Sequence, residues 1–195
     1  MQLYRIMLYS LALGFFVMFF LSSAAHAEMT IHVNKETHTL TLFKDGTNIA
    51  RYDIIIGRPQ TPTPSFVTQF QTIDINPTWN PTPSEIRQIS KHSDMIKFNG
   101  ILFTNEGKMY SPGGPRNPLG KARLNLEYEI KVRIHGTNEP DLFKTKRRNY
   151  SHGCIRVLEI KDLVTTIVQQ YKIDDINWNQ KYTIKLPEEV RVIVD

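Results

Sequence analysis

The only cysteine of the 195-residue sequence, Cys154, lies in the stretch NYSHGCIRV at positions 149–157. His152 stands two positions before it, Gly153 separates the two, and Arg156 follows two positions later. A thiolate attacks a carbonyl carbon far better than a thiol does, and the pKa of an ordinary cysteine is about 8.5. A nucleophilic cysteine therefore needs a nearby imidazole that takes its proton and a third group that orients the imidazole.

Two histidines are candidates for this proton acceptor. His152 would share the face of Cys154 along an extended backbone, whereas His135 ends a predicted strand and can approach Cys154 only through folding. Gly153 lets the backbone come close to a substrate, and the amides around Cys154 are candidate oxyanion-hole donors. Arg156 carries a planar fork of donors that suits a carboxylate. These residue types indicate acyl transfer through a cysteine nucleophile.

Zinc binding is the alternative chemistry for this cluster. His135, His152 and Cys154 would supply one cysteine and two histidines, but the His-x-Cys spacing is tight, and no acidic ligand or further cysteine sits nearby. The Gly-Gly-Pro at positions 113–115 lacks the Gly-Lys-Ser/Thr of a phosphate-binding loop. We therefore predict neither a metal nor a cofactor.

The elements that must position these residues are mostly strands. Alternating apolar residues predict strands over Thr30–Asn34, Thr39–Lys44, Ala50–Ile56, Phe66–Ile75, Arg123–Leu126, Glu129–His135, Tyr182–Leu186 and Val190–Val194. Apolar residues at helical spacing predict a helix over Glu159–Tyr171, and a second helix is expected over Ser84–Ser93. Prolines and glycines predict long loops over Gly57–Ser65, Asn76–Ser84 and Met109–Gly120. The pattern indicates a mainly β, mostly antiparallel fold with one or two helices.

The amino terminus predicts export. A basic residue, an apolar run and the small residues Ala25-His26-Ala27 are typical of a secretory signal peptide over residues 1–27, cleaved after Ala27. The apolar run is nearly long enough to span a bilayer, so an uncleaved anchor is the alternative. Residues 28–195 are then expected to form a single domain. A lone cysteine in an exported chain cannot form an internal disulfide, which favours a thiol kept for its reactivity.

The charge balance says less about partners. The formal net charge is +5 at pH 7, and it favours anionic polymers or carboxylate-bearing substrates in general. No basic repeat, RNA motif or alternation of aromatic and basic residues argues for nucleic acid. We predict no nucleic-acid partner, and a membrane contact only through an uncleaved signal.

Two motifs carry a resemblance to a known family. Ile134–Thr137 (IHGT) followed by Ser151–Arg156 (SHGCIR) resembles the signature of the L,D-transpeptidase catalytic domain, called the YkuD domain. The segment from position 31 to 66 resembles the first hairpin, third strand and Thr-Pro loop of that family, whose fold is sandwich- or barrel-like. The motifs NPTWN at 76–80 and PGGP through NPLG at 112–120 resemble the branch that carries a capping segment, which implies a lid or capping insertion over residues 76–108.

The resemblance implies a role for each site residue. Cys154 matches the nucleophile, His135 the general base, and the carbonyl of Gly136 the group that orients this histidine. The remaining matches are the oxyanion and substrate-binding residues: His152 as the second histidine that shapes the oxyanion site, Ser151 beside it, and Gly153 with Cys154 as amide donors. Arg156 is left with two roles, binding of a substrate carboxylate or bracing of the loop.

The resemblance also implies a reaction in the periplasm, at the cell wall. Cys154 would attack the third residue of a peptidoglycan tetrapeptide stem, release D-alanine and form a thioester. An amine of a second stem would then give a cross-link in cell-wall biogenesis, and a lipoprotein lysine would give an anchored protein. The alternatives are an L,D-carboxypeptidase or D-amino-acid exchange enzyme on the same scaffold, or a non-catalytic wall-binding module. Capture of Cys154 by carbapenems is a further implication.

Overall fold

The fold is that of a computed structural model, which describes residues 28–79, 102–103, 109–110, 117–127, 132–173 and 175–195. The expected signal peptide over residues 1–27, the helix predicted over Ser84–Ser93 and most of the expected capping insertion over 76–108 lie outside these residues. Within the described part, no helix is long and apolar enough to cross a membrane.

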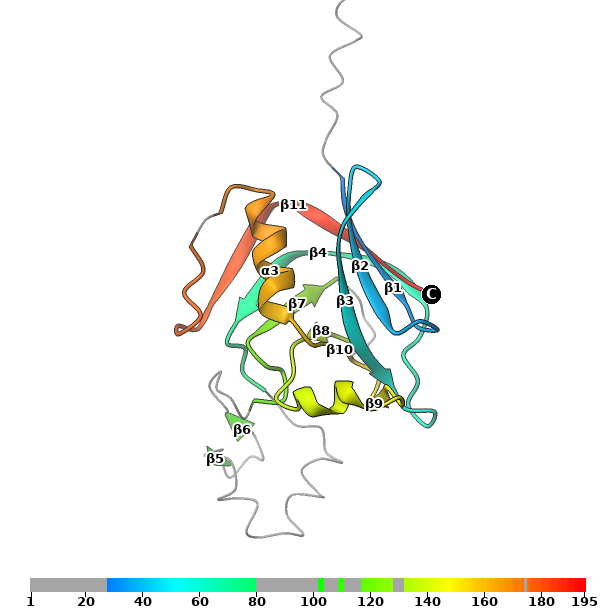
Figure 1. Ribbon diagram of the computed structural model, residues 1–195. Helices are drawn as coiled ribbons and strands as arrows, with labels where there is room; N and C mark the ends of the chain where they lie inside the picture. Colours follow the sequence, from blue (N-terminus) through cyan, green and yellow to red (C-terminus); the bar gives the residue numbers. More distant parts are fainter. Residues whose placement is uncertain (1–27, 80–101, 104–108, 111–116, 128–131, 174) are drawn as a thin grey trace, which may run out of the picture.

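Most of the described strands form one closed sheet. Its order is β10-β8-β7-β4-β11-β1-β2-β3-β9, and a further β10–β3 pairing closes it into a barrel (Figure 1). The strands are β1 (Met29–Asn34), β2 (Thr39–Lys44), β3 (Thr47–Gly57), β4 (Phe66–Ile75), β7 (Ala122–Leu126), β8 (Ile134–His135), β9 (Asn149–Ser151), β10 (Ile155–Val157) and β11 (Tyr182–Val194). The described pairings are antiparallel except β1–β11, β8–β10 and β3–β9. This architecture confirms the predicted mainly β, mostly antiparallel fold.

The helix α3 (Ile160–Gln169) packs against β3 and β7 (Figure 1). Its buried residues recur at helical spacing: Ile160, Leu163, Val164, Ile167 and Val168. They join the apolar core of the barrel, where burial of each such side chain stabilises the fold by about 1.5–3 kcal/mol. The observed helix is slightly shorter at both ends than the predicted Glu159–Tyr171. A short 3-10 helix, η2 (Pro140–Lys144), was not predicted.

Three predicted elements differ from the structure. Of the strand predicted over Glu129–His135, only Ile134–His135 pairs among the described residues. The two strands predicted at the carboxyl end are one strand, β11, whose register shifts between Lys185 and Val190. Pro187 lies at this shift, where its missing amide hydrogen costs no ladder bond. The loop predicted over Met109–Gly120 begins with β6 (Met109–Tyr110), which pairs with β5 (Leu102–Phe103).

Candidate active site

The loop that carries Cys154 crosses over the end of β3. Before the loop, β9 pairs with β3 in parallel, and after it β10 pairs with β3 antiparallel. The amide of Arg58, just past the end of β3, donates to the carbonyl of Ser151 at 3.0 Å, whereas the carbonyl of Asp53 accepts from the amide of Leu158 at 3.2 Å. Along a strand, the backbone N–H and C=O groups of successive residues point alternately to the two edges. The even-numbered Arg58 and the odd-numbered Asp53 therefore bond to neighbours on different edges. β9 and β10 therefore lie on opposite edges of β3.

Two threonines of the proline-rich loop hold the cysteine loop in place. The hydroxyl of Thr63 accepts from the amide of Gly57 at 2.9 Å and donates to the carbonyl of Gly153 at 2.8 Å. The hydroxyl of Thr61 donates to the carbonyl of Ser151 at 3.3 Å. Thr63 is buried, so both of its bonds are shielded from water. The sequence alone did not single out these threonines, although the repeated Thr-Pro of the loop was a signal for them.

The turn at Gly153 depends on glycine and on Ser151. Gly153 has a φ of +115°, a conformation that residues with a side chain rarely adopt. The buried hydroxyl of Ser151 accepts from the amide of Gly153 at 3.1 Å and donates to the carbonyl of Cys154. The Gly153 amide, an expected oxyanion-hole donor, is therefore engaged within the loop. His152 is exposed, and Cys154 is partly exposed.

Strand register sets His135 beside β10, the strand that directly follows Cys154. In the parallel β8–β10 pair, His135 lies opposite Arg156, and Cys154 stands two residues before Arg156. Because side chains alternate along a strand with a period of two, Arg156 and His135 project from the same face. Cys154 lies just before β10, and continuing the alternation to it predicts the same face. The amide of Ile155, the residue after Cys154, donates to the carbonyl of Arg133 at 2.8 Å, which extends the pairing to the cysteine loop.

One hydrogen bond determines the tautomer of His135. Its Nδ1 lies 2.7 Å from the carbonyl oxygen of Gly136. A carbonyl can only accept, so Nδ1 carries the proton and Nε2 of the neutral ring is the acceptor. Burial lowers the pKa of His135 to about 4, with the guanidinium groups of Arg156 and Arg123 acting in the same direction and the Gly136 carbonyl opposing them. The imidazole is therefore neutral near pH 7, which is the form that a general base requires.

Two arginines near the loop differ in their partners. The guanidinium of Arg156 forms an ion pair with Glu139 at 2.6 Å and ties β10 to the segment that precedes η2. The backbone of Arg58 is bonded to Ser151, but its buried Nε has no hydrogen-bond partner within the described part of the chain. Arg58 was not among the predicted site residues.

Close backbone packing positions the His-Gly-Thr segment. A Cβ atom at Gly136 would lie 2.6 Å from Cγ2 of Ile160 on α3, and one at Gly120 would lie 2.5 Å from the amide nitrogen of Thr137. Gly120 also has a φ of +65°. Asn117 supports this turn, because its buried side chain donates to the carbonyl of Pro77 and accepts from the amide of Leu119. The Asn-Pro-Leu-Gly motif is thus the support on which Gly136 rests.

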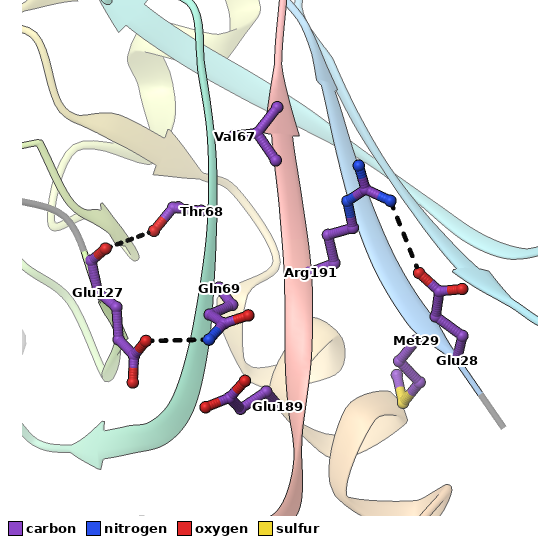
Figure 2. Close-up of a pocket in the computed structure, with 8 residues that line it drawn as sticks. All are labelled: Glu28, Met29, Val67, Thr68, Gln69, Glu127, Glu189 and Arg191. Atoms are coloured by element: carbon purple, nitrogen blue, oxygen red, sulfur yellow. Dashed lines mark hydrogen bonds and ion pairs between the residues drawn. The ribbon is translucent and has the colours of Figure 1, made fainter. Parts of the chain in front are cut away.

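The structure also contains a cleft away from this site. Figure 2 shows it, with a volume of about 480 Å³, lined by Glu28, Met29, Val67, Thr68, Gln69, Glu127, Glu189 and Arg191. Hydrogen bonds from Thr68 and Gln69 to Glu127 and a long ion pair between Arg191 and Glu28 occupy its polar groups. None of the predicted site residues lines it. Among the described residues, no three His, Cys, Asp or Glu side chains gather as a metal site.

Residues 28–178 match the YkuD family model, the L,D-transpeptidase catalytic domain. The match covers most of the chain, and the protein belongs to this family.

Three known proteins illustrate the relationship. A protein of Haemophilus influenzae assigned as an L,D-transpeptidase is 22% identical over 72% of this chain and 34% of its own length. Escherichia coli ErfK/SrfK, likewise assigned, is 30% identical over 71% of this chain and 41% of its own length. The structure of the L,D-transpeptidase LdtMt1 in complex with imipenem has the same fold, with a TM-score of 0.50 and 12% identity over 87% of this chain and 59% of that chain. This chain thus spans less than half the length of the two curated relatives.

Proposed function

We propose that the protein is an exported, cysteine-dependent L,D-transpeptidase that acts on peptidoglycan tetrapeptide stems. The observation that carries the proposal is the β8–β10 register, which sets His135 opposite Arg156, two residues after Cys154. The bond from Nδ1 of His135 to Gly136 supports it, because the lone pair of Nε2 is then available to a thiol. Family membership gives the reaction class.

The first half-reaction forms a thioester. Nε2 of His135 takes the proton of the Cys154 thiol as the sulfur attacks the carbonyl carbon of the third stem residue. The amide of Cys154 and His152 stabilise the negative charge that develops on the carbonyl oxygen, since the Gly153 amide is bound to Ser151. His135 then gives its proton to the nitrogen of the terminal D-alanine, the carbon–nitrogen bond breaks, and D-alanine leaves.

The second half-reaction transfers the acyl group. An amine of a second stem attacks the thioester, Nε2 of His135 takes a proton from that amine, and the sulfur leaves and is protonated again. A lipoprotein lysine as the attacking amine would anchor a protein instead. When the acceptor is the amine of a second stem, the product is a cross-link between the third residues of two stems.

Stem peptides carry carboxylates, which a cation beside the loop would recognise. We assign this role to Arg58, because its Nε is buried without a partner in the described residues and its backbone is bonded to the cysteine loop. Arg156 is assigned to bracing, since its guanidinium is bound to Glu139.

Export and domain organisation are part of the proposal. Residues 1–27 serve as a cleaved signal peptide, and residues 28–195 form one catalytic domain in which 76–108 is a capping insertion. β1 begins at Met29, directly after the proposed cleavage point. The nitrogen of Glu28 lies 3.0 Å from Oδ1 of Asp45, so a new terminal ammonium would form an ion pair there. Intact mass measurement of the periplasmic protein tests this, and retention of residues 1–27 would contradict it.

The central experiment follows the products of purified residues 28–195 with tetrapeptide stems by mass spectrometry. Loss of D-alanine together with stem dimers is the expected result. The Cys154→Ala variant should fold and show neither product, because a small change at a partly exposed position costs little stability. Normal turnover by that variant would refute the nucleophile. Tripeptide without dimers would show an L,D-carboxypeptidase instead, since water would then be the acceptor.

A further inference from the structure

A row of polar side chains crosses one face of the sheet and passes through His135. Thr183 of β11 lies opposite Asp74 of β4, and Asp74 lies opposite Arg123 of β7. Arg123 lies in turn opposite His135 of β8, and Arg156 of β10 lies on the other side of this histidine. Residues directly opposite each other on paired strands project from the same face. His135 is thus placed between two arginines.

Hydrogen bonds fix the guanidinium of Arg123 in this row. Nη2 of Arg123 donates to Oδ2 of Asp74 at 2.5 Å, and its Nε donates to Oδ1 of Asn125 at 3.0 Å. The hydroxyl of Thr183 donates to the other oxygen of Asp74 at 2.7 Å. Burial opposes the ionisation of Asp74, but hydrogen bonds from Thr183, Asn125 and Arg123 outweigh it and hold the pKa of this carboxyl below its usual value. The pair therefore stays charged well below neutral pH.

We propose that Arg123 is a positioning residue for the reaction, which fixes a positive charge opposite His135 and, together with burial of the ring and with Arg156, disfavours the imidazolium. This inference rests on the proposed function for its chemistry. A guanidinium keeps its charge at every pH at which the protein is folded, so its effect on the imidazole is constant.

The surroundings of His135 agree with this role. Among the residues that the structure describes, the charged groups that face it are Arg123 from β7 and Arg156 from β10, and both disfavour the imidazolium. Their carboxylate partners, Asp74 and Glu139, are bound to the arginines and offset them only in part. From α3 the nearest side chain to Gly136 is the apolar Ile160.

A neutral imidazole is needed twice in each catalytic cycle. It must accept the thiol proton of Cys154 at the start, and it must accept a proton from the incoming amine when the thioester is present. Between these steps, an imidazolium next to Arg123 is a stronger acid and gives its proton more readily to the leaving nitrogen of D-alanine. Arg123 therefore keeps the ring in its acceptor form and favours proton release to the leaving nitrogen, while it makes the imidazole a correspondingly weaker base, and it does so without contact with the substrate.

The test compares three variants by NMR titration of the His135 ring, in the pH range where circular dichroism shows the wild-type fold. Arg123→Gln removes the charge and should raise the titration midpoint by about 0.5 pH units or more. Arg123→Lys keeps the charge and should leave it near the wild-type value. Asp74→Asn removes the carboxylate that balances Arg123 and should lower the titration midpoint of His135. Arg191→Gln is the matched control, because Arg191 lies eight residues beyond Thr183 along β11, at the cleft of Figure 2.

The same variants are then acylated with a carbapenem as a function of pH, with mass detection at Cys154. The acidic limb of the acylation rate should shift in parallel with the NMR midpoint. An unchanged midpoint in both Arg123→Gln and Asp74→Asn would overturn the inference, and so would a shift of the same size in Arg191→Gln. Because the NMR measurement needs no turnover, a protein that fails to process stems would refute the proposed function while the role of Arg123 is still tested.

Discussion

Lowering the pH should destabilise the fold through one side chain, His135. Its pKa of about 4 lies below the ordinary 6.5 because the ring is buried, and it would return to the ordinary value on unfolding. Between these two values the unfolded chain binds the proton more tightly than the folded chain does. The free energy of unfolding therefore rises with pH in this window and falls as the pH drops from 6.5 through 4.

The size of the effect follows from the gap between the two pKa values. One pKa unit corresponds to about 1.4 kcal/mol, so the full gap corresponds to about 3 kcal/mol. Most of this is lost by about pH 4, and about 2 kcal/mol is already lost by about pH 5. A domain of this kind has a total stability of about 5–15 kcal/mol, so a single histidine would account for a measurable part of its acid sensitivity.

Urea unfolding of the wild type and of His135→Gln, from about pH 7 to pH 4, isolates this contribution. Other titrating groups, Asp74 included, act alike in both proteins and cancel in the difference. The wild type should lose about 3 kcal/mol more than His135→Gln over this range. A difference that does not change with pH would show that His135 titrates alike in the folded and unfolded chains, and the argument from burial would fail.

Three further substitutions test the support of the loop. Thr63→Val should lower the free energy of unfolding in urea by about 2 kcal/mol and slow the acylation of Cys154 by a carbapenem. The reason is that it leaves the buried Gly57 amide and Gly153 carbonyl without partners. Full stability would show that water replaces the hydroxyl. Gly153→Ala should cost about 1–3 kcal/mol through backbone strain alone, because a Cβ there meets no atom closer than 3.8 Å. Gly136→Ala should cost about 1–3 kcal/mol and lower the acylation rate, since its Cβ would overlap Ile160; an unchanged acylation rate would separate α3 packing from the orientation of His135.

Long local patterns were predictable from the sequence. β2 and β4 have the predicted bounds, because each shows several apolar alternations and ends at a turn or loop signal. The motifs around His135 and Cys154 predicted the family without any knowledge of the fold, since they combine rare residue types at fixed spacing. β8 was predicted as the end of a longer strand, and β9 and β10 were not predicted. Each has only two or three paired residues, too few to show a period.

The contacts that hold the site were not predictable in this way. Thr63 bonds to Gly153 across 90 residues of sequence, and Arg123 meets Asp74 across 49. Nothing local distinguishes Thr63 from the other threonines of its loop, or Arg123 from an exposed arginine on a strand. Their roles follow from strand register, which is fixed by the packing of the whole sheet.

Barrel closure and alignment of the site depend on the same strand. β10 pairs with β3 on one side, which closes the barrel, and with β8 on the other, which sets His135 opposite Arg156. A slip of one residue in the β8–β10 pair would turn the imidazole to the opposite face, because side chains alternate along a strand. The strands are too short to fix this register by themselves, so the fixed points must lie at the ends of the loop. Thr63 under Gly153 and the Arg156–Glu139 ion pair are such points, which explains why bonds outside the catalytic pair should control the rate at which Cys154 reacts.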